Sequence, residues 1–328
     1  MTLPEPQLSD AFGRRFGYLR LSVTDQCNFR CNYCLPDGYQ CSEKPTYLVL
    51  DEIRCAVAAF AALGTRKVRV TGGEPSLRKD LPDIIRIVAQ TPGIDQVAIT
   101  TNGYRLLHAV QDWADAGLTH LNLSIDSLDP AQFANITGHD RLPYLLQGLE
   151  KALALGLKVK VNAVLLRGFN RHQLQDFLAW IRHTPVSLRF IELMQTGDNQ
   201  VFFTEHHVSG DEIRQQLLQQ GWQPRLKEIN AGPALEFQHP DYRGRIGLIM
   251  PYSKDFCASC NRLRLSSVGK LHLCLFGEQG HDIRTLLEAG KEDLLQARLL
   301  TLLGEKRVSH SLHQGATGAT RHLAMLGG

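Results

Sequence analysis

The chain has 328 residues, 43% of them hydrophobic, which is enough for one large α/β domain or for a barrel with an appendage. Its formal net charge is +3 with both signs mixed along the sequence, so it lacks the basic field of a nucleic-acid-binding protein. Residues 1–17 do not resemble a signal peptide, and no run of 18 apolar residues occurs. We therefore expect a soluble, cytoplasmic protein that binds neither nucleic acids nor membranes.

From residue 18 onward, short β-branched runs alternate with longer helical patterns. Asp51 is the predicted N-cap of the first helix. Six β-α repeats predict a parallel sheet, either open or curled toward a barrel. In α/β barrels the chemistry lies at the carboxyl ends of the strands, where polar residues gather in this sequence. Strands are predicted over 18–24, 67–71, 96–101, 120–126, 158–165 and 187–194, and helices over 51–63, 80–90, 105–116, 141–155 and 171–183.

After about residue 195 the pattern changes. We place a boundary near residues 225–232, which divides the chain into domains 1–228 and 229–328. The tail from Gly315 onward is rich in small residues and ends in Gly327-Gly328, so we expect it to be mobile. A helix is predicted over 209–220, strands over 234–238, 245–250, 263–267 and 270–275, and helical stretches near 282–304.

Eight cysteines in a reducing compartment indicate metal ligands rather than disulfides. Cys41 and Cys55 are interpreted as an inert loop thiol and a small core residue. The other six form two sets of three, each one ligand short of a closed four-coordinate shell. An open position is where a metal can meet a substrate. The sets are Cys27-x3-Cys31-x2-Cys34 and Cys257-x2-Cys260 with Cys274.

The spacing of the first set alone fits an iron-sulfur cluster and other metal sites equally well. With Tyr33 between its last two cysteines, and Gly72-Gly73-Glu74-Pro75 one β-α unit later, the set resembles the radical S-adenosylmethionine (SAM) superfamily. Paired glycines allow backbone to approach a ligand closely, and the Glu74 carboxylate can accept from an ammonium. The resemblance implies a [4Fe-4S] cluster whose fourth iron binds SAM. It also implies SAM contacts at Tyr33, Gly73, Ser124 and Met194.

On spacing alone, the second set and His272 favour a Cys3His zinc site, because His272 and Cys274 would face the same side of a strand. Nearly the whole chain, however, resembles the GTP 3′,8-cyclase family of molybdenum cofactor biosynthesis. The match includes Leu19-Arg20-Leu21-Ser22-Val23-Thr24, Asn261-Arg262-Leu263-Arg264 and the terminal Gly-Gly. That resemblance implies a second [4Fe-4S] cluster whose open iron meets the guanine of GTP. His272 is then a neighbour rather than a ligand.

Six cations interrupt the apolar strands. A cation that points into a barrel needs an anion, since burying it unpaired is very unfavourable. For any one cation that anion could be Asp126 or Glu192, but the cations outnumber the inward acids. Arginine's planar fork suits phosphate, so we infer a bound triphosphate, held by side chains because no P-loop motif occurs. The six are Arg20, Arg69, Lys160, Arg189, Arg262 and Arg264. The family resemblance implies that GTP contacts five of these, all but Arg189. It also implies a GTP contact at Thr100.

The resemblance further implies a partial (β/α)6 TIM-type barrel of the radical SAM type, closed by a C-terminal α+β region. Residues 1–228 would form the radical SAM core with an N-terminal extension, and 229–328 the substrate and second-cluster region. The implied reaction is SAM cleavage by one electron, abstraction of the ribose 3′ hydrogen, and addition of that carbon radical to guanine C8. One further electron and a proton then give the 7,8-dihydro product. Arg262, Arg264, Gly327 and Gly328 are the implied catalytic residues.

The implied partners are GTP, a flavodoxin-like electron donor, a downstream enzyme that forms cyclic pyranopterin, and a second copy of the chain in a homodimer. The alternatives are another two-cluster radical SAM enzyme and an iron-sulfur or zinc protein for electron transfer or binding. Ferredoxin-type clusters need four cysteines, whereas each set here has three.

Overall fold

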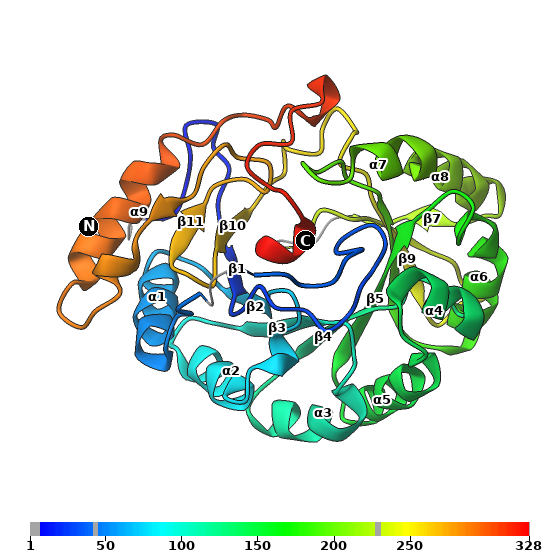
Figure 1. Ribbon diagram of the computed structural model, residues 1–328, viewed down its shortest axis with the longest axis horizontal. Coiled ribbons are helices and arrows are strands. Elements are labelled where there is room, and N and C mark those ends of the chain that lie inside the picture. The colour runs from blue at the N-terminus through cyan, green and yellow to red at the C-terminus, as the bar shows by residue number, and fades with distance from the viewer. Residues whose placement is uncertain (1–6, 42–44, 227–230, 328) are drawn as a thin grey trace.

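The computed structural model describes residues 7–41, 45–226 and 231–327. Within these residues, twelve strands form one sheet in the order β12-β11-β10-β1-β2-β3-β4-β5-β6-β9-β8-β7, and the sheet curls with its helices outside (Figure 1). The strands are β1 Tyr18–Ser22, β2 Lys67–Thr71, β3 Gln96–Thr101, β4 His120–Ser124, β5 Lys158–Leu165, β6 Ser187–Glu192, β7 Gln223–Pro224, β8 Leu235–Gln238, β9 Arg245–Ile249, β10 Arg262–Leu265, β11 Lys270–His272 and β12 His281–Asp282. The helices are α1 Leu50–Ala62, α2 Leu81–Gln90, α3 Leu106–Asp115, α4 Pro130–Thr137, α5 Leu142–Ala154, α6 Leu174–His183, α7 Gln200–His206, α8 Gly210–Gln219 and α9 Glu292–Leu303.

Strands β1 to β6 run parallel to their neighbours, which confirms the predicted partial barrel. The C-terminal strands extend both edges of the same sheet, because β9 pairs in parallel with β6 and β10 pairs in parallel with β1. Strands from both predicted domains therefore share one sheet. The predicted boundary at residue 228 falls on residues 227–230, which lie outside the described residues.

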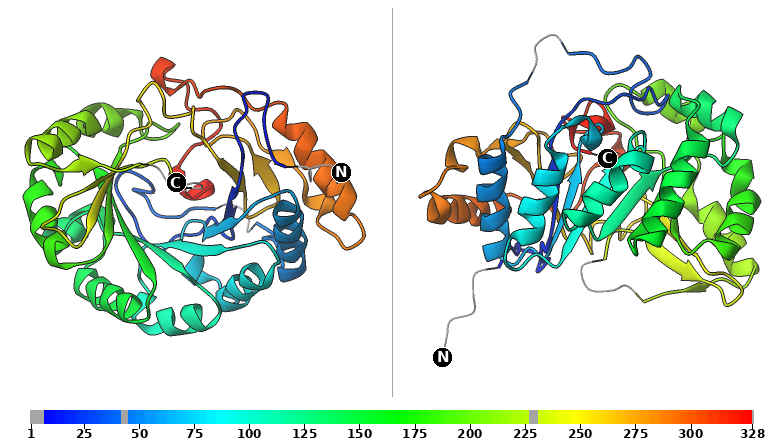
Figure 2. Two further views of the ribbon diagram at one scale, coloured as in Figure 1. Left: turned by 180° about the vertical axis from the view of Figure 1, so that it is seen from behind. Right: turned by 90° about the horizontal axis from the view of Figure 1, so that it is seen from below.

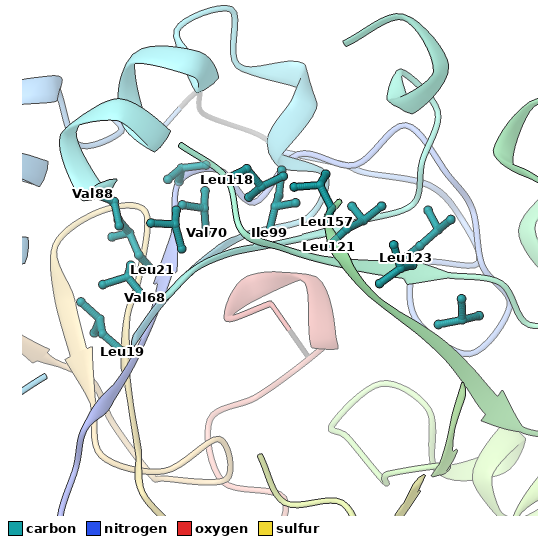
Figure 3. Packing of buried hydrophobic residues seen from close by; sticks show 14 of the residues in the cluster. Leu19, Leu21, Val68, Val70, Val88, Ile99, Leu118, Leu121, Leu123 and Leu157 are labelled. Atoms are coloured by element: carbon teal, nitrogen blue, oxygen red, sulfur yellow. The ribbon is translucent and has the colours of Figure 1, made fainter. Parts of the chain in front are cut away.

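The two faces of the sheet differ in chemistry, because side chains alternate along each strand. The outer face is apolar and packs against the helices, as Figure 3 shows for Leu19, Val68, Ile99 and Leu121. This outer layer forms the main core. The inner face carries the alternate residues of the same strands, many of them charged or polar, so the interior of the barrel is suited to a polar ligand.

Several local predictions are wrong. Helix α1 begins at Leu50, one residue before the predicted N-cap Asp51, and the side chain of Glu52 accepts from the Val49 N–H at 2.8 Å. Two short helices, α4 and α7, were not predicted. The expected strand 270–275 ends at His272. No helix in the described ranges is long and apolar enough to cross a membrane.

The C-terminal segment lies inside the ring of strands when the barrel is viewed from either end (Figure 1, Figure 2). Its last turn, Leu323–Met325, and Leu326 pack in a small apolar cluster with Leu275 and Phe276. The tail is thus packed into the barrel, contrary to the mobility expected from its composition. Gly328 lies outside the described residues.

Candidate active site

The first three cysteines lie on the loop that follows β1, at the carboxyl rim of the barrel. The loop turns tightly, since the backbone N–H groups of Cys34 and Leu35 both donate to the carbonyl of Cys31 at 2.9 Å. Phe29 anchors the loop: it is buried, and its ring stacks on His139 with centroids 4.6 Å apart. Three half-buried thiols are thereby held on one short, anchored segment.

Burial raises the pKa of these thiols to about 11 for Cys27 and about 12 for Cys34, and well above the usual range for Cys31. Such thiols become thiolates when a bound metal supplies positive charge. Donors already face the sulfurs, because Asn102 Nδ2 is 3.9 Å from Cys27 Sγ and backbone N–H groups of the C-terminal turn donate to Cys34. The three residues therefore fit a cluster bound by three thiolates.

Gly72 and Gly73 bring the loop after β2 against the cysteine loop. Gly72 has a φ of +154°, and a Cβ there would lie 2.2 Å from the carbonyl oxygen of Thr24. A Cβ at Gly73 would lie 2.2 Å from the carbonyl oxygen of Gln26. The Gly73 N–H donates to the Thr24 carbonyl at 3.0 Å. The missing side chains let the backbone of the cysteine loop approach closely, and the expected close approach to a ligand stays a prediction.

Glu74 is fully buried and joins this loop to the end of β3. Its carboxylate accepts from the Ser76 N–H at 2.9 Å, from Thr101 Oγ1 at 2.7 Å and from the Asn102 N–H at 2.7 Å. Both carboxylate oxygens accept from protein donors, and a further contact of Glu74 with a ligand ammonium stays a prediction. Glu74 also positions Asn102, whose side chain reaches Cys27.

The positions matched to SAM contacts lie together on the carboxyl side of the barrel. Ser124 is the last residue of β4, and Met194 follows the end of β6 by two residues. Tyr33 donates to Asp126 Oδ2 at 3.0 Å, and burial raises the pKa of Asp126 to about 6. Gly73 follows β2 by two residues. Their roles in SAM binding stay predictions.

The second three cysteines line a cavity of about 90 Å³ inside the barrel. Across the described residues, no three His, Cys, Asp or Glu side chains come close enough to share one metal ion. Cys274 lies beyond the end of β11, so it and His272 do not share a strand face as predicted. His272 is also absent from the cavity wall.

His310 is the histidine that does line this cavity, and sequence reasoning missed it. Burial opposes ionisation of Cys257, but hydrogen bonds from His310 outweigh it, and the pKa of this thiol falls to about 6. For Cys260, burial is likewise outweighed by the charges of Arg262 and Lys306, which lower its pKa. These two thiols are more readily ionised than those of the first loop. No spacing rule linked His310 to cysteines about fifty residues earlier.

Strand register places the arginines side by side. Arg20 on β1 pairs with Arg264 on β10 and with Arg69 on β2, so three guanidinium groups occupy one level of the inner face. One level toward the amino ends, Tyr18 stands between Arg262 and Lys67 in the same way. Sequence reasoning missed Lys67, although its spacing of two from Arg69 places it on the same face.

Most of these cations have no carboxylate partner. In the described part of the chain, Arg69, Lys160, Arg262 and Arg264 form no ion pair, whereas Arg189 pairs with Glu236 on β8 at 3.3 Å. Burial, reinforced by Arg189, lowers the pKa of Lys160 to about 6. Burial and Arg262 lower the pKa of Arg264 to about 10. The inner face is therefore a concentration of positive charge that an anion would stabilise.

A second cavity of about 550 Å³ lies toward the amino ends of the strands and shares Arg189 with the first. Its wall includes Lys67, His120 and Lys160. Thr100, the remaining position matched to GTP, has a buried hydroxyl without a hydrogen-bond partner among the described residues. The two cavities form a cationic path from the second cysteine set toward the amino ends of the strands.

The C-terminal tail reaches the arginine level of the barrel. Arg20 Nη2 donates to the carbonyl oxygen of Gly327. Gly327 has a φ of +62°, and a Cβ there would collide with the side chain of Thr71 at 2.3 Å. The apolar cluster beneath this turn touches both Cys34 and Cys274. The tail therefore lies between the two cysteine sets.

Residues 21–181 match the radical SAM superfamily, and residues 186–312 match the family described as Molybdenum Cofactor Synthesis C. The chain is 59% identical over 328 residues to a GTP 3′,8-cyclase of Aeromonas hydrophila subsp. hydrophila, covering 98% of this chain and 96% of that protein. It is 57% identical over 323 residues to a GTP 3′,8-cyclase of Tolumonas auensis, with the same coverage of both chains. It is similar in fold to Streptococcus suis SuiB bound to S-adenosylmethionine, with a TM-score of 0.62, 13% identity and coverage of 87% of this chain and 68% of that one.

Proposed function

The chain belongs to the GTP 3′,8-cyclase family of the radical SAM superfamily, and on that premise we propose that it converts GTP to (8S)-3′,8-cyclo-7,8-dihydroguanosine 5′-triphosphate. This reaction is the first step of molybdenum cofactor biosynthesis. The observation that carries the proposal is the row Arg264-Arg20-Arg69, which lines the same cavity as Cys257, Cys260 and Cys274. Three adjacent guanidinium groups suit a polyphosphate, and three cysteines suit a metal centre that leaves one position to the substrate.

Cys27, Cys31 and Cys34 would hold the radical-generating [4Fe-4S] cluster, with Tyr33, Gly73, Ser124 and Met194 around the bound SAM. When bound, this cofactor pair supplies the 5′-deoxyadenosyl radical that removes the 3′ hydrogen of the ribose. The protein's part is to hold the ribose against that radical and to exclude other reactants.

GTP would be fixed at both ends. Cys257, Cys260 and Cys274 would hold a second [4Fe-4S] cluster that receives the guanine, and Arg262 and Arg264 line the same cavity as these cysteines. The triphosphate would extend along Arg20 and Arg69 toward Thr100 and Lys160, since Arg69 and Lys160 form no ion pair among the described residues. Fixing base and phosphates holds C8 near C3′ and reduces the entropy lost in the cyclisation step.

The Gly327-Gly328 end would complete the substrate cavity, since the Gly327 carbonyl already accepts from Arg20. We further propose that a flavodoxin-like protein supplies both electrons, one for SAM cleavage and one that, with a proton, reduces the radical left after cyclisation. A cyclic-pyranopterin-forming enzyme would receive the product. The homodimer and the cytoplasmic location stay predictions.

Metal analysis after anaerobic reconstitution tests the second cluster. We expect about eight irons and eight acid-labile sulfides per chain, since each [4Fe-4S] cluster contributes four of each. Serine substitution of all three C-terminal cysteines should halve both numbers and leave SAM cleavage in place. One zinc with four irons would contradict the two-cluster arrangement and favour a zinc-containing radical SAM enzyme.

A further inference from the structure

The amino-terminal ends of α3 and α5 form an exposed aromatic and cationic surface. We call it the α3–α5 patch and define it by Tyr104, Arg105, Arg141 and Tyr144. Tyr104 is 38% exposed and Tyr144 50% exposed. The Arg141 guanidinium lies over both rings, 4.8 Å from the Tyr104 centroid and 5.3 Å from the Tyr144 centroid. Between the two helices is a surface hollow of about 480 Å³.

Tyr104 connects this patch to the first cysteine loop. The Tyr104 ring meets Phe29 edge to face with centroids 6.3 Å apart, and Phe29 lies between Cys27 and Cys31 in the sequence. The Tyr104 N–H also donates to Asn102 Oδ1 at 3.0 Å, and Asn102 Nδ2 is 3.9 Å from Cys27 Sγ. The exposed residue Tyr104 is thus connected to the Cys27 sulfur through one intervening residue, Asn102.

The composition of the patch is that of a protein interface. Tyrosine and arginine are enriched at the centres of such interfaces, where they supply most of the binding energy. Within the described ranges, Arg105 and Arg141 form no ion pair. Two exposed carboxylates, Asp112 and Asp140, are their acidic neighbours, so positive charge remains in excess.

The opposite side of the cysteine loop offers no comparable access. The apolar cluster of the C-terminal turn packs against Cys34 there, and the cavity of about 90 Å³ inside the barrel, which the second cysteine set lines, is far too small for a protein. A protein that delivers electrons to this loop therefore has to approach from outside the barrel.

On the basis of the proposed function, we propose that the α3–α5 patch is the docking site for a one-electron carrier protein with an acidic rim around an exposed prosthetic group. The arginines attract the acidic rim and orient the carrier. The tyrosines form the contact centre. The carrier is oxidised by one electron and the cluster bound by Cys27, Cys31 and Cys34 is reduced by one, and no covalent bond forms between the two proteins.

The test compares two reductants on the reconstituted holoenzyme. Photoreduced flavodoxin serves as the acidic carrier, and dithionite serves as a small reductant that needs no docking surface. In the double variant Arg105→Glu/Arg141→Glu, 5′-deoxyadenosine formation should fall about tenfold or more with flavodoxin and stay within about twofold of the unmodified enzyme with dithionite. Tyr144→Ala should give the same pattern.

Arg298→Glu is the matched control, because Arg298 is exposed on α9 in a different part of the barrel exterior (Figure 1). It should not alter the rate with either reductant. Equal rates for the double variant and the control with flavodoxin would overturn the proposal. So would equal losses with flavodoxin and dithionite, since these would mean that the patch residues only support the cysteine loop.

Direct binding separates this proposal from the proposed function. The dissociation constant for oxidised flavodoxin should rise about tenfold in Arg105→Glu/Arg141→Glu and remain unchanged in Arg298→Glu. For the unmodified enzyme it should rise with ionic strength, because salt screens the attraction between the arginines and the acidic rim. An unchanged dissociation constant in the double variant would overturn the docking site even if GTP is cyclised. Absence of GTP cyclisation with dithionite would instead contradict the proposed function.

Discussion

Arg20 on the first strand donates a hydrogen bond to the backbone carbonyl of Gly327, 307 residues later in the chain. This contact joins the arginine row of the barrel to the tail that lies between the two cysteine sets. Arg20 is one of the residues proposed to contact the triphosphate, so substrate and tail share it. The tail is therefore part of the proposed site.

Deleting Gly327 and Gly328 should leave both clusters intact and stop product formation, because Arg20 loses its tail partner and the cavity opens. Iron content and product yield measure the two effects. Gly327→Ala should have a similar effect on yield, since its Cβ would strike Thr71. Gly315→Ala is the control, with an equally positive φ and no atom within 4 Å of the new Cβ. Unchanged turnover in the deletion variant would mean that the tail contributes to packing and not to the reaction.

Replacing Arg264 with alanine should lower kcat/KM for GTP by at least about 30-fold, equivalent to about 2 kcal/mol of lost charge-assisted binding. Slow cleavage of SAM without GTP should persist, since Arg264 lies on the side of the second cysteine set. The measurement is 5′-deoxyadenosine and cyclised nucleotide from one reaction. Equal loss of both activities would mean that Arg264 only maintains the fold.

Binding of GTP should be accompanied by proton uptake at Lys160. Burial, together with Arg189, Lys67 and Arg69, lowers the pKa of Lys160 to about 6, so near pH 8 the free enzyme holds this amine neutral. A triphosphate beside it favours the ammonium and raises the pKa. Near pH 8 phosphate groups, with a second pKa of about 6, are already ionised, so they do not mask the uptake.

Calorimetric titration of GTP in buffers with different ionisation enthalpies measures this uptake, which should approach one proton per GTP. The uptake should disappear in Lys160→Met. It should also decrease as the pH falls through about 6, because Lys160 is then protonated before GTP binds. Identical enthalpies in all buffers would place the triphosphate elsewhere.

Glu74→Gln should destabilise the protein by about 1–3 kcal/mol, because an amide NH2 then faces donors that the carboxylate satisfies. Denaturant unfolding of the protein without metal measures this. Asp83→Asn is the matched control: its ion pair with Arg86 is exposed on α2, so the change should be below about 1 kcal/mol. A larger decrease in the free energy of unfolding for Asp83→Asn than for Glu74→Gln would contradict the positioning role of the buried Glu74 carboxylate.

The β-α repeats predicted the parallel sheet, and the family resemblance implied that it curls into a partial barrel. Alternation along a strand predicted the inner cations, because it fixes which side chains share a face. The same reasoning could have found Lys67. It could not find His310, since the return of a long irregular tail into the barrel depends on packing of Leu323 and Leu326 rather than on periodicity. Nor could it find the three protein donors around the Glu74 carboxylate, because the fold brings Ser76 of the turn after β2 together with Thr101 and Asn102 at the end of β3.

The most direct test of the account is one anaerobic reaction with 3′-deuterated GTP, SAM and dithionite, analysed by mass spectrometry. The account predicts transfer of deuterium to 5′-deoxyadenosine, together with a cyclised nucleotide that retains the triphosphate. Cleavage of SAM without deuterium transfer and without a GTP-derived product would contradict it.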